Sequence, residues 1–523
     1  MPQVLELRLR KRLKLQSKVV AAALIFAAAC ALAIAVRRQF TGRDSRSASL
    51  SEKLSHQWQL YERAEATLVD RVRSGGRINR REWERLVQAS GRFRWTARDR
   101  EELRRAHRRR IDARARAARE ASRIDLDEVR KSGDVRRFCE QLPKGGMLHV
   151  HPTGTLKPET VAQLAARGNP MVGKKGLAYP RAFHSRELAF LENYAGDVRY
   201  LDLAAQDQVH FQRLFVLPPE TSDFRRFAAV FPLVSVLRQA LPADAWLVIC
   251  DAFFLRAQAQ RLRYVEFTMQ VEPTEAQARE LEETARRAQE RYGITLRVNA
   301  AFDRAASREE NAGRLRRLVA FLDSRPLPVV AGFDLSGEEA KHAALDSGQS
   351  LYGYLLGDPP RRSRFRRTMH AGVGDMRNMR DAMLMGAERI GHATQAFADP
   401  VALEFAGFHQ LAVEANLVSN VRLGYAKSFA AHPFLDLLRL GLRVSLSTDD
   451  EGILETELSK EFAAAITHTD ITYAEVRQLV LNSIETSFAG PVEKEKLRSA
   501  VEGELASFEE EWSARGLTAG RVP

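Results

Sequence analysis

Cysteine is scarce in this chain, with three residues among 523. Cys30 lies inside an apolar run, so at most Cys139 and Cys250 could pair, and two buried thiols are the simpler expectation. The small number of cysteines excludes a disulfide-stapled scaffold. A hydrophobic content of 45% and a charged content of 28% are those of a globular protein.

Acidic residues are too few to balance the basic ones, and the net charge is +14, much of it before residue 125. Residues 1–18 are rich in Arg and Lys, and Val19–Val36 then carries no charge. That run is roughly 18 residues long, about the minimum that spans a bilayer. The basic flank before the run outweighs Arg37 and Arg38 after it, which predicts a cytoplasmic N-terminus and an exported remainder.

Two processing routes fit this N-terminus. Residues 1–44 could form an uncleaved signal anchor that tethers the protein to a membrane through residues 19–36, and the length of the run favours this interpretation. Cleavage after Ala33-Ile34-Ala35 would instead release a secreted or periplasmic protein. Both routes predict a main domain outside the cytoplasm.

Residues 45–140 contain no proline and are dominated by Glu, Arg, Ala and Leu, a composition that predicts helices. Arginine is dense between Arg77 and Arg123. Interspersed Glu and Asp favour a solvated helical face. Packing on the main domain, or pairing of two subunits through this extension, is the alternative. A basic patch could also bind nucleic acid or anionic lipid headgroups, but we expect no specific nucleic-acid binding.

Eight short apolar runs follow residue 140, separated by helical patterns such as Glu275–Arg291 and Ser307–Asp323. Near-continuous apolar strands that alternate with helices predict a parallel sheet, and eight repeats predict a (β/α)8 barrel over residues 141–523. The long connection at about residues 157–245 should form helices over the barrel mouth, such as Phe224–Leu241. The runs are Met147–His151, Tyr264–Met269, Thr295–Phe302, Val329–Leu335, Thr368–Gly372, Arg389–Ala393, Leu411–Leu417 and Val444–Asp450.

Polar side chains occur where these runs end, which is the catalytic face of such a barrel. His149 and His151 stand at i and i+2, so they point to one face of the first strand. Taken alone, they could be ordinary surface histidines after a loop. An ordered set of polar residues on strand ends is harder to explain by packing. The set is Glu266, Asp334, His370, His392, Glu414, Asn416, Asp449 and Asp450.

Three imidazoles and one carboxylate, from His149, His151, His370 and Asp449, are a ligand set for one Zn²⁺ per chain. Zinc lowers the pKa of water toward 7 and so makes hydroxide available. His392 could orient that water by a hydrogen bond, and Asp449 or Asp450 could carry its proton to a leaving group. The predicted chemistry is metal-assisted hydrolysis at an electrophilic carbon.

On the basis of these residues, the chain resembles the adenosine deaminase family of the metal-dependent amidohydrolase superfamily over about residues 141–490. The export signal and helical extension look most like the secreted, growth-factor-type branch, in which the extension supports dimerisation. The motifs that carry the resemblance are Pro143-Lys144-Gly145-Gly146-Met147-Leu148-His149-Val150-His151, Phe333-Asp334-Leu335-Ser336-Gly337-Glu338-Glu339, His370-Ala371-Gly372, Arg389-Ile390-Gly391-His392, Ser419-Asn420, His432-Pro433 and Ser447-Thr448-Asp449-Asp450.

The resemblance implies a nucleoside substrate and a role for each matching residue. It places zinc on His149, His151, His370 and Asp449. It gives His392 an electrostatic and water-positioning role, Asp450 a hydrogen bond to the purine, and Gly337 a backbone contact to it. The family usually has an Asp shortly after the second histidine to contact the ribose; here Thr153 stands in that stretch and is the candidate substrate contact.

One departure from the family pattern bears on the reaction. The family follows His-Ala-Gly with a Glu that protonates the purine ring, whereas this chain has Val373, which cannot transfer a proton. Asp375 is a candidate replacement acid. Three functions remain open: a zinc aminohydrolase for adenosine or a related amino-purine, a zinc hydrolase for an amide or lactone, and a metal-binding pseudoenzyme. His392 argues against the last, because a purely structural site does not need it.

Overall fold

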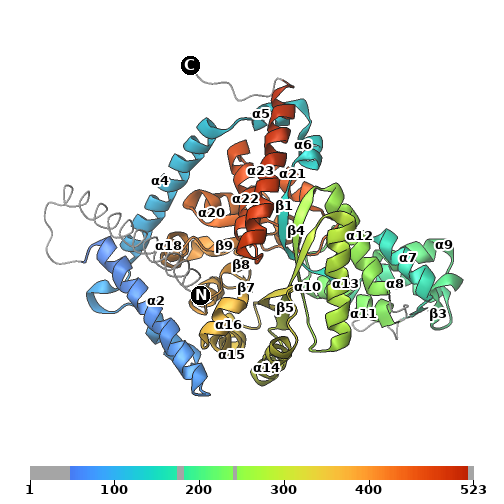
Figure 1. The fold of residues 1–523 in the computed structure, drawn as a ribbon, viewed down its shortest axis with the longest axis horizontal. Coiled ribbons are helices and arrows are strands. Elements are labelled where there is room, and N and C mark those ends of the chain that lie inside the picture. The colour runs from blue at the N-terminus through green and yellow to red at the C-terminus, as the bar shows by residue number, and fades with distance from the viewer. Residues whose placement is uncertain (1–47, 174–181, 240–243, 516–523) are drawn as a thin grey trace, which may run out of the picture.

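A computed structural model describes residues 48–173, 182–239 and 244–515 (Figure 1). Its centre is an eight-stranded sheet in the order β1-β4-β5-β6-β7-β8-β9-β10, with every neighbouring pair parallel. A bridge between Val150 and Asp449 joins the last strand region to the first and closes the barrel. The strands are β1 (Gly145–Val150), β4 (Leu262–Met269), β5 (Thr295–Asp303), β6 (Val330–Ser336), β7 (Arg366–Ala371), β8 (Arg389–His392), β9 (Ala412–Ala415) and β10 (Arg443–Leu446).

Helices cover the outside of this barrel, and the predicted (β/α)8 architecture is confirmed. Each of the eight predicted runs contains or overlaps one strand, because strands buried on both faces need apolar residues at nearly every position. The covering helices are α13 (Glu275–Tyr292), α14 (Arg308–Ser324), α15 (Ala344–Leu356), α16 (Pro359–Arg364), α17 (Met376–Leu384), α18 (Pro400–Phe408), α19 (Leu417–Arg422), α20 (Phe434–Leu440), α21 (Leu458–His468), α22 (Tyr473–Glu485) and α23 (Pro491–Ser513).

The long connection between β1 and β4 forms a helical insertion with a hydrophobic cluster of its own, on one side of the barrel in Figure 1. It packs on the segments that follow β9 and β10: Leu217 N donates to Ile453 O at 2.8 Å, and Arg422 Nη2, at the end of α19, donates to Leu217 O at 2.6 Å. The expected helices on the barrel mouth are thus confirmed. The insertion contains η2 (Pro152–Thr155), α7 (Pro158–Gly168), β2 (Met171–Val172), α8 (Ser185–Leu188), η5 (Ala189–Asn193), β3 (Val198–Arg199), η6 (Tyr200–Asp202), α9 (Ala205–Arg213), α10 (Phe224–Ala228), α11 (Val230–Gln239) and α12 (Ala245–Ala259).

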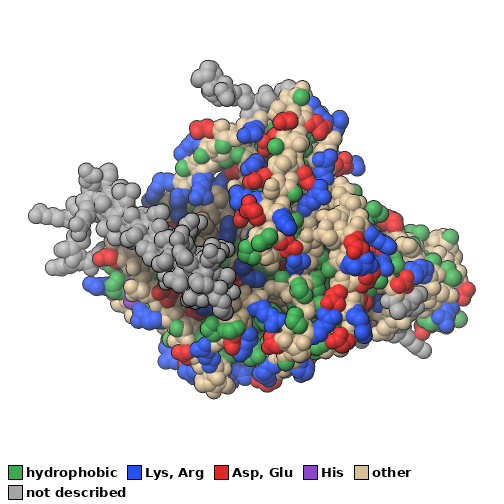
Figure 2. Space-filling view, in the orientation of Figure 1, with side chains coloured by type: hydrophobic (Ala, Val, Ile, Leu, Met, Phe, Trp, Pro, Cys, Tyr) green, Lys and Arg blue, Asp and Glu red, His purple; other side chains and the backbone are tan. Residues whose placement is uncertain are grey.

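The N-terminal extension packs on the barrel. Trp83 Nε1 donates to the buried Asp381 at 2.8 Å, and His107 Nε2 lies 2.8 Å from Glu404. Arginines on the outer side of α4 stay solvated, and Figure 2 shows Lys and Arg side chains along this helix and in the hollow beside it. The elements are α2 (Leu50–Arg73), α3 (Arg80–Val87), η1 (Gly91–Phe93), α4 (Ala97–Ala121), α5 (Leu126–Ser132) and α6 (Val135–Gln141).

Two expectations concern the N-terminal segment and the cysteines. In the described part of the chain, no helix has both the length and the apolar character that a membrane span requires. The expected span at residues 19–36 lies outside that part and remains a prediction. Cys139 and Cys250 are both buried, and neither forms a disulfide within the described residues, as expected.

Lys144 fixes the start of β1 to its neighbours. Its buried Nζ donates to Cys139 O at 2.5 Å, Leu142 O at 3.0 Å and Gln260 O at 3.2 Å. We expect Lys144→Met to lower the free energy of unfolding by about 3 kcal/mol, because three carbonyl groups lose their donor. Chemical denaturation measures this change. The matched control is Lys131→Met, since that side chain is 70% exposed, and equal stability of the two variants would contradict the assignment.

Candidate metal centre

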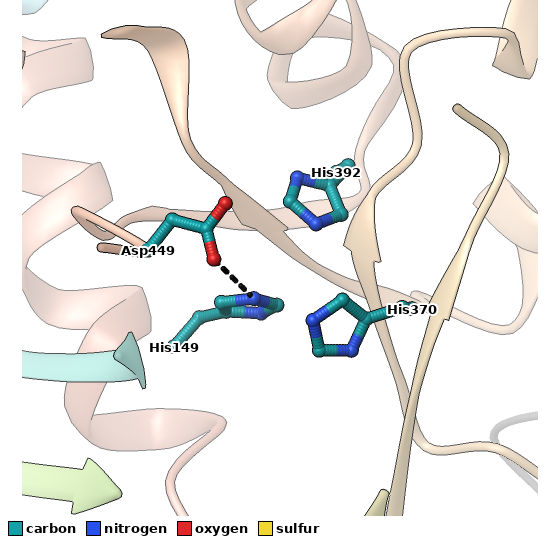
Figure 3. A group of neighbouring side chains, drawn as sticks. All are labelled: His149, His370, His392 and Asp449. Carbon is teal, nitrogen blue, oxygen red and sulfur yellow. Dashed lines mark ion pairs between the residues drawn. The ribbon is translucent and has the colours of Figure 1, made fainter. Parts of the chain in front are cut away.

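Three histidine side chains and one aspartate converge at the carboxyl ends of β1, β7 and β10. His151 Nε2 lies 3.3 Å from both Asp449 Oδ1 and His370 Nε2, and His149 Nε2 lies 3.4 Å from Asp449 Oδ1. Figure 3 shows His149, His370 and Asp449 around one point, with His392 beside them. The structure therefore brings together the predicted ligand set.

Each ligand histidine is held through its other ring nitrogen. His149 Nδ1 lies 2.7 Å from Glu414 Oε2, and His151 Nδ1 lies 3.1 Å from the carbonyl oxygen of Thr268. His370 Nδ1 lies at ion-pair distance, 2.8 Å, from Asp334 Oδ2, although this contact does not have the angles of a hydrogen bond. Acceptors at Nδ1 keep a proton there and leave Nε2 for a metal, an arrangement typical of metal-binding histidines.

The chemistry of this donor set fits a divalent metal ion. His149 Nε2 is buried and has no hydrogen-bond partner among the described residues. A zinc ion held by three imidazole nitrogens and one carboxylate oxygen has four protein ligands, so it binds water or substrate by becoming five-coordinate. Groupings of His149, His370, His392 and Asp449, and of His151, Asp449 and Asp450, each bring their ligand atoms within 4.8 Å of one another.

His392 also lies at the centre, but the hydrogen bonds of its ring are opposite to those of the other three histidines. Its Nδ1 faces two amide nitrogens, Asn420 Nδ2 at 2.9 Å and Asn416 Nδ2 at 3.2 Å. Amide N–H groups donate, so Nδ1 accepts and the proton of the neutral ring is on Nε2. His392 therefore has a proton rather than a lone pair on Nε2, which is available as a hydrogen-bond donor toward the centre. Its role in positioning water remains a prediction.

The backbone is strained where it presents these side chains. His392 and Asp449 have φ values of +70° and +62°, and Ala393 follows with +53°. Non-glycine residues in this region cost of order 1–3 kcal/mol each and persist where surrounding structure enforces them. At His392 and Asp449 the strain coincides with side chains turned into the barrel.

The carboxylates of the centre differ in their ionisation. Burial opposes the charge on Asp449, but its contacts with His149 and His151 hold its pKa well below the usual range. Burial and the neighbouring Asp449 raise the pKa of Asp450 well above its usual value. The Arg389 guanidinium, whose Nε donates to Glu414 at 2.5 Å, outweighs burial and keeps the pKa of Glu414 low.

His149 lies between the carboxylates of Asp449 and Glu414. Burial lowers the pKa of His149, but these two carboxylates outweigh burial and raise the pKa to about 10. Because a metal ion binds the neutral imidazole, metal binding at His149 is coupled to proton release.

The loop that carries Val373 is held by Glu339, whose carboxylate accepts from Gly372 N at 2.8 Å and Val373 N at 3.0 Å. The contacts of Asp375 argue against it as the replacement acid. Asp375 caps α17 and forms an ion pair with Arg377 at 2.6 Å. These contacts outweigh burial and lower its pKa, so it is a poor proton donor.

The predicted substrate contacts lie at the same end of the barrel. Thr153 is half-buried in η2, and its neighbour Gly154 lies so close to Asp450 that a Cβ there would stand 1.7 Å from Asp450 Oδ1. Gly337 follows β6 with φ +107°, and a Cβ there would stand 2.9 Å from Asp303 Oδ1. Contacts of Thr153, Gly337 and Asp450 with a substrate remain predictions.

The residues that hold the ligands were not assigned this role from sequence. Glu414 and Asp334 stand out as polar residues in apolar strands, and Asp334 also lies inside a family motif. Ser419, whose Oγ donates to Asp449 Oδ2 at 2.6 Å, appeared only inside a motif.

We expect Glu414→Gln to weaken zinc binding by about 10–100-fold, because groups that support a ligand histidine contribute about that much affinity. Competition with a chelator measures the change. Glu388→Gln is the matched control, since it removes the same charge from the start of β8, where Glu388 pairs with Arg366 at 2.6 Å and Arg367 at 2.8 Å. Equal zinc affinities for both variants would rule out the proposed support of His149.

Comparison with known proteins identifies similar chains. A family model described as adenosine deaminase matches residues 186–504, a range that begins after His149 and His151. An adenosine deaminase from Serratia proteamaculans is 30% identical over 213 residues, or 40% of this chain and 61% of that protein. One from Enterococcus faecalis is 25% identical over 374 residues, or 69% of this chain and 96% of that protein. The match thus spans about three fifths of the Serratia relative.

A solved structure, that of adenine deaminase from Arthrobacter aurescens, has the same fold. It is 22% identical in sequence, with a TM-score of 0.52, and the match covers 70% of this chain and 99% of that one. At this identity the likeness shows the barrel architecture.

Proposed function

The chain belongs to the adenosine deaminase family, and on that premise we propose that it is a zinc-dependent aminohydrolase for adenosine or a related amino-purine. The observation that supports this proposal is the arrangement of the histidine and aspartate side chains at the metal centre. His149 and His151 present Nε2 to Asp449, and His370 Nε2 lies 3.3 Å from His151 Nε2. His392 presents a donor beside them.

Zinc would be held by His149, His151, His370 and Asp449, whose ligand atoms lie 3.3–3.4 Å apart in the contacts described above, one ion per chain. When bound, it would supply hydroxide at neutral pH. His392 donates from Nε2 to the attacking oxygen and sets its direction. A carboxylate, Asp449 or Asp450, accepts the proton of that oxygen and returns it to the leaving amine. Asp450 also contacts the purine, with Gly337 and Thr153 beside it.

Val373 favours a second candidate, a zinc hydrolase for a substrate that needs no ring protonation, such as an amide or lactone. In that reaction the carboxylate shuttle alone suffices. Adenosine deamination without the ring acid should be slow, since one general acid contributes about 10²–10⁴-fold.

A substrate panel separates the two candidates. We would incubate the zinc-loaded full-length chain with adenosine, adenine and AMP, and in parallel with amides and lactones, and follow product formation. Ammonia from any amino-purine supports the first candidate. Hydrolysis confined to amides or lactones supports the second.

We also propose that the protein is exported and either anchored through residues 19–36 or released by cleavage, and that the extension supports a homodimer. The basic N-terminal flank and the solvated arginines of α4 motivate these proposals. Cell fractionation of the full-length chain tests the first, and light scattering tests the second. A cytoplasmic monomer would contradict both.

A further inference from the structure

A chain of buried hydrogen bonds begins at the backbone of α20 and ends at His392. Its first link joins Phe434 N to His432 Nδ1 at 3.2 Å. A backbone N–H can only donate, so His432 Nδ1 must carry the lone pair and its proton must be on Nε2. Burial lowers the pKa of His432 to about 3, so this ring is neutral.

The second link sets the orientation of Asn420. His432 Nε2 lies 2.8 Å from Asn420 Oδ1 and donates to it. The amide oxygen is therefore turned to His432, and the amide nitrogen must face the other way. That nitrogen, Asn420 Nδ2, lies 2.9 Å from His392 Nδ1.

Asn416 Nδ2, 3.2 Å from His392 Nδ1, is a second donor to the same atom. We propose that Asn420 and His432 are positioning residues that, beside this second donor, lock His392 in the tautomer with its proton on Nε2. Each group in the chain fixes the donor and acceptor atoms of the next one, from Phe434 toward His392. The order is fixed because the first donor is a peptide N–H, which cannot accept a hydrogen bond. His432 and Asn420 are 4% and 0% exposed, so water does not compete for these bonds. The assignment of the tautomer stands independently of the proposed function. The catalytic consequence, that His392 donates a hydrogen bond to the reacting water, rests on the proposed function.

The locked tautomer matters because four imidazoles crowd this centre. The His392 ring centroid lies 4.9 Å from that of His149 and 5.2 Å from that of His370. With a lone pair on Nε2, His392 would compete for the metal ion. With a proton there, His392 is left to donate to an oxygen of the reacting water. In Figure 3, one ring nitrogen of His392 faces the other labelled side chains.

Nitrogen-15 NMR of the full-length, histidine-labelled chain tests the tautomer directly, because protonated and lone-pair ring nitrogens differ widely in chemical shift. We expect a proton on His392 Nε2 and on His432 Nε2 in the wild type. In Asn420→Asp, the carboxylate can only accept, so the proton should appear on His392 Nδ1. A wild-type His392 protonated on Nδ1, or an unchanged pattern in Asn420→Asp, would overturn the proposal.

Steady-state kinetics test the catalytic role of the donor on His392 Nε2. Removal of one preorganised donor costs about 10²–10³-fold in kcat, which is the loss we expect for Asn420→Asp at little change in KM. His432→Leu frees the Asn420 amide and should also lower kcat, whereas His432→Gln restores a donor at the Nε2 position and should recover part of the loss. Equal kcat for His432→Leu and His432→Gln would overturn the proposal. If no variant or wild type releases ammonia, the proposed function fails while the NMR result still decides the tautomer.

Discussion

Replacement of Val373 by glutamate is expected to raise the rate of adenosine deamination by about 10²–10⁴-fold, the usual contribution of a positioned general acid. The backbone that would present this side chain is already held, because Glu339 accepts hydrogen bonds from Gly372 N and Val373 N. The buried Glu339 carboxylate would also raise the pKa of a carboxyl group beside it, which keeps the new acid protonated near neutral pH.

Initial rates of ammonia release measure this effect. The matched control is Val373→Gln, which has the same shape as glutamate but no transferable proton, and it should show no gain. If Val373→Glu is no faster than Val373→Gln while both bind zinc, the pocket is not built for adenosine, and the amide or lactone alternative gains support.

Removal of one metal ligand is expected to lower the rate of deamination by a factor of similar size. His370→Ala should lose bound zinc and lower kcat/KM by about 10³-fold or more, since metal stabilisation of the transition state is worth several kcal/mol. His370 Nε2 lies 3.3 Å from His151 Nε2, so its removal leaves a gap in the donor set.

Metal content after dialysis and ammonia release measure both changes on the same sample, and circular dichroism checks folding. His210→Ala is the control, because this histidine is 56% exposed on the insertion and away from the centre. A His370→Ala variant that retains full zinc and full activity would show that the centre lies elsewhere.

The barrel could be predicted from sequence because its strands are buried on both faces, so their composition identifies them without tertiary information. The packing of the extension could not. Trp83 meets Asp381 across 298 residues of sequence, and a helix with solvated arginines looks the same whether it packs on the barrel or on another subunit.

The ligands of the candidate site were recognisable as histidine and aspartate at the ends of apolar strands. The residues that support these ligands could not be recognised from sequence. Contacts such as that of His149 with Glu414, 265 residues apart, exist only in the folded chain. Sequence position made Asp375 a candidate acid, whereas the fold uses its carboxylate to cap α17 and to pair with Arg377.

The central claim is metal-dependent hydrolytic deamination, and ammonia release from adenosine by the full-length chain tests it most directly. The assay would compare the protein as purified, after removal of metal with a chelator, and after zinc is restored to one ion per chain. We predict that ammonia release disappears with the metal and returns with zinc. A chain that holds one zinc ion and releases no ammonia from adenosine or another amino-purine, or that releases it equally without metal, would contradict the claim.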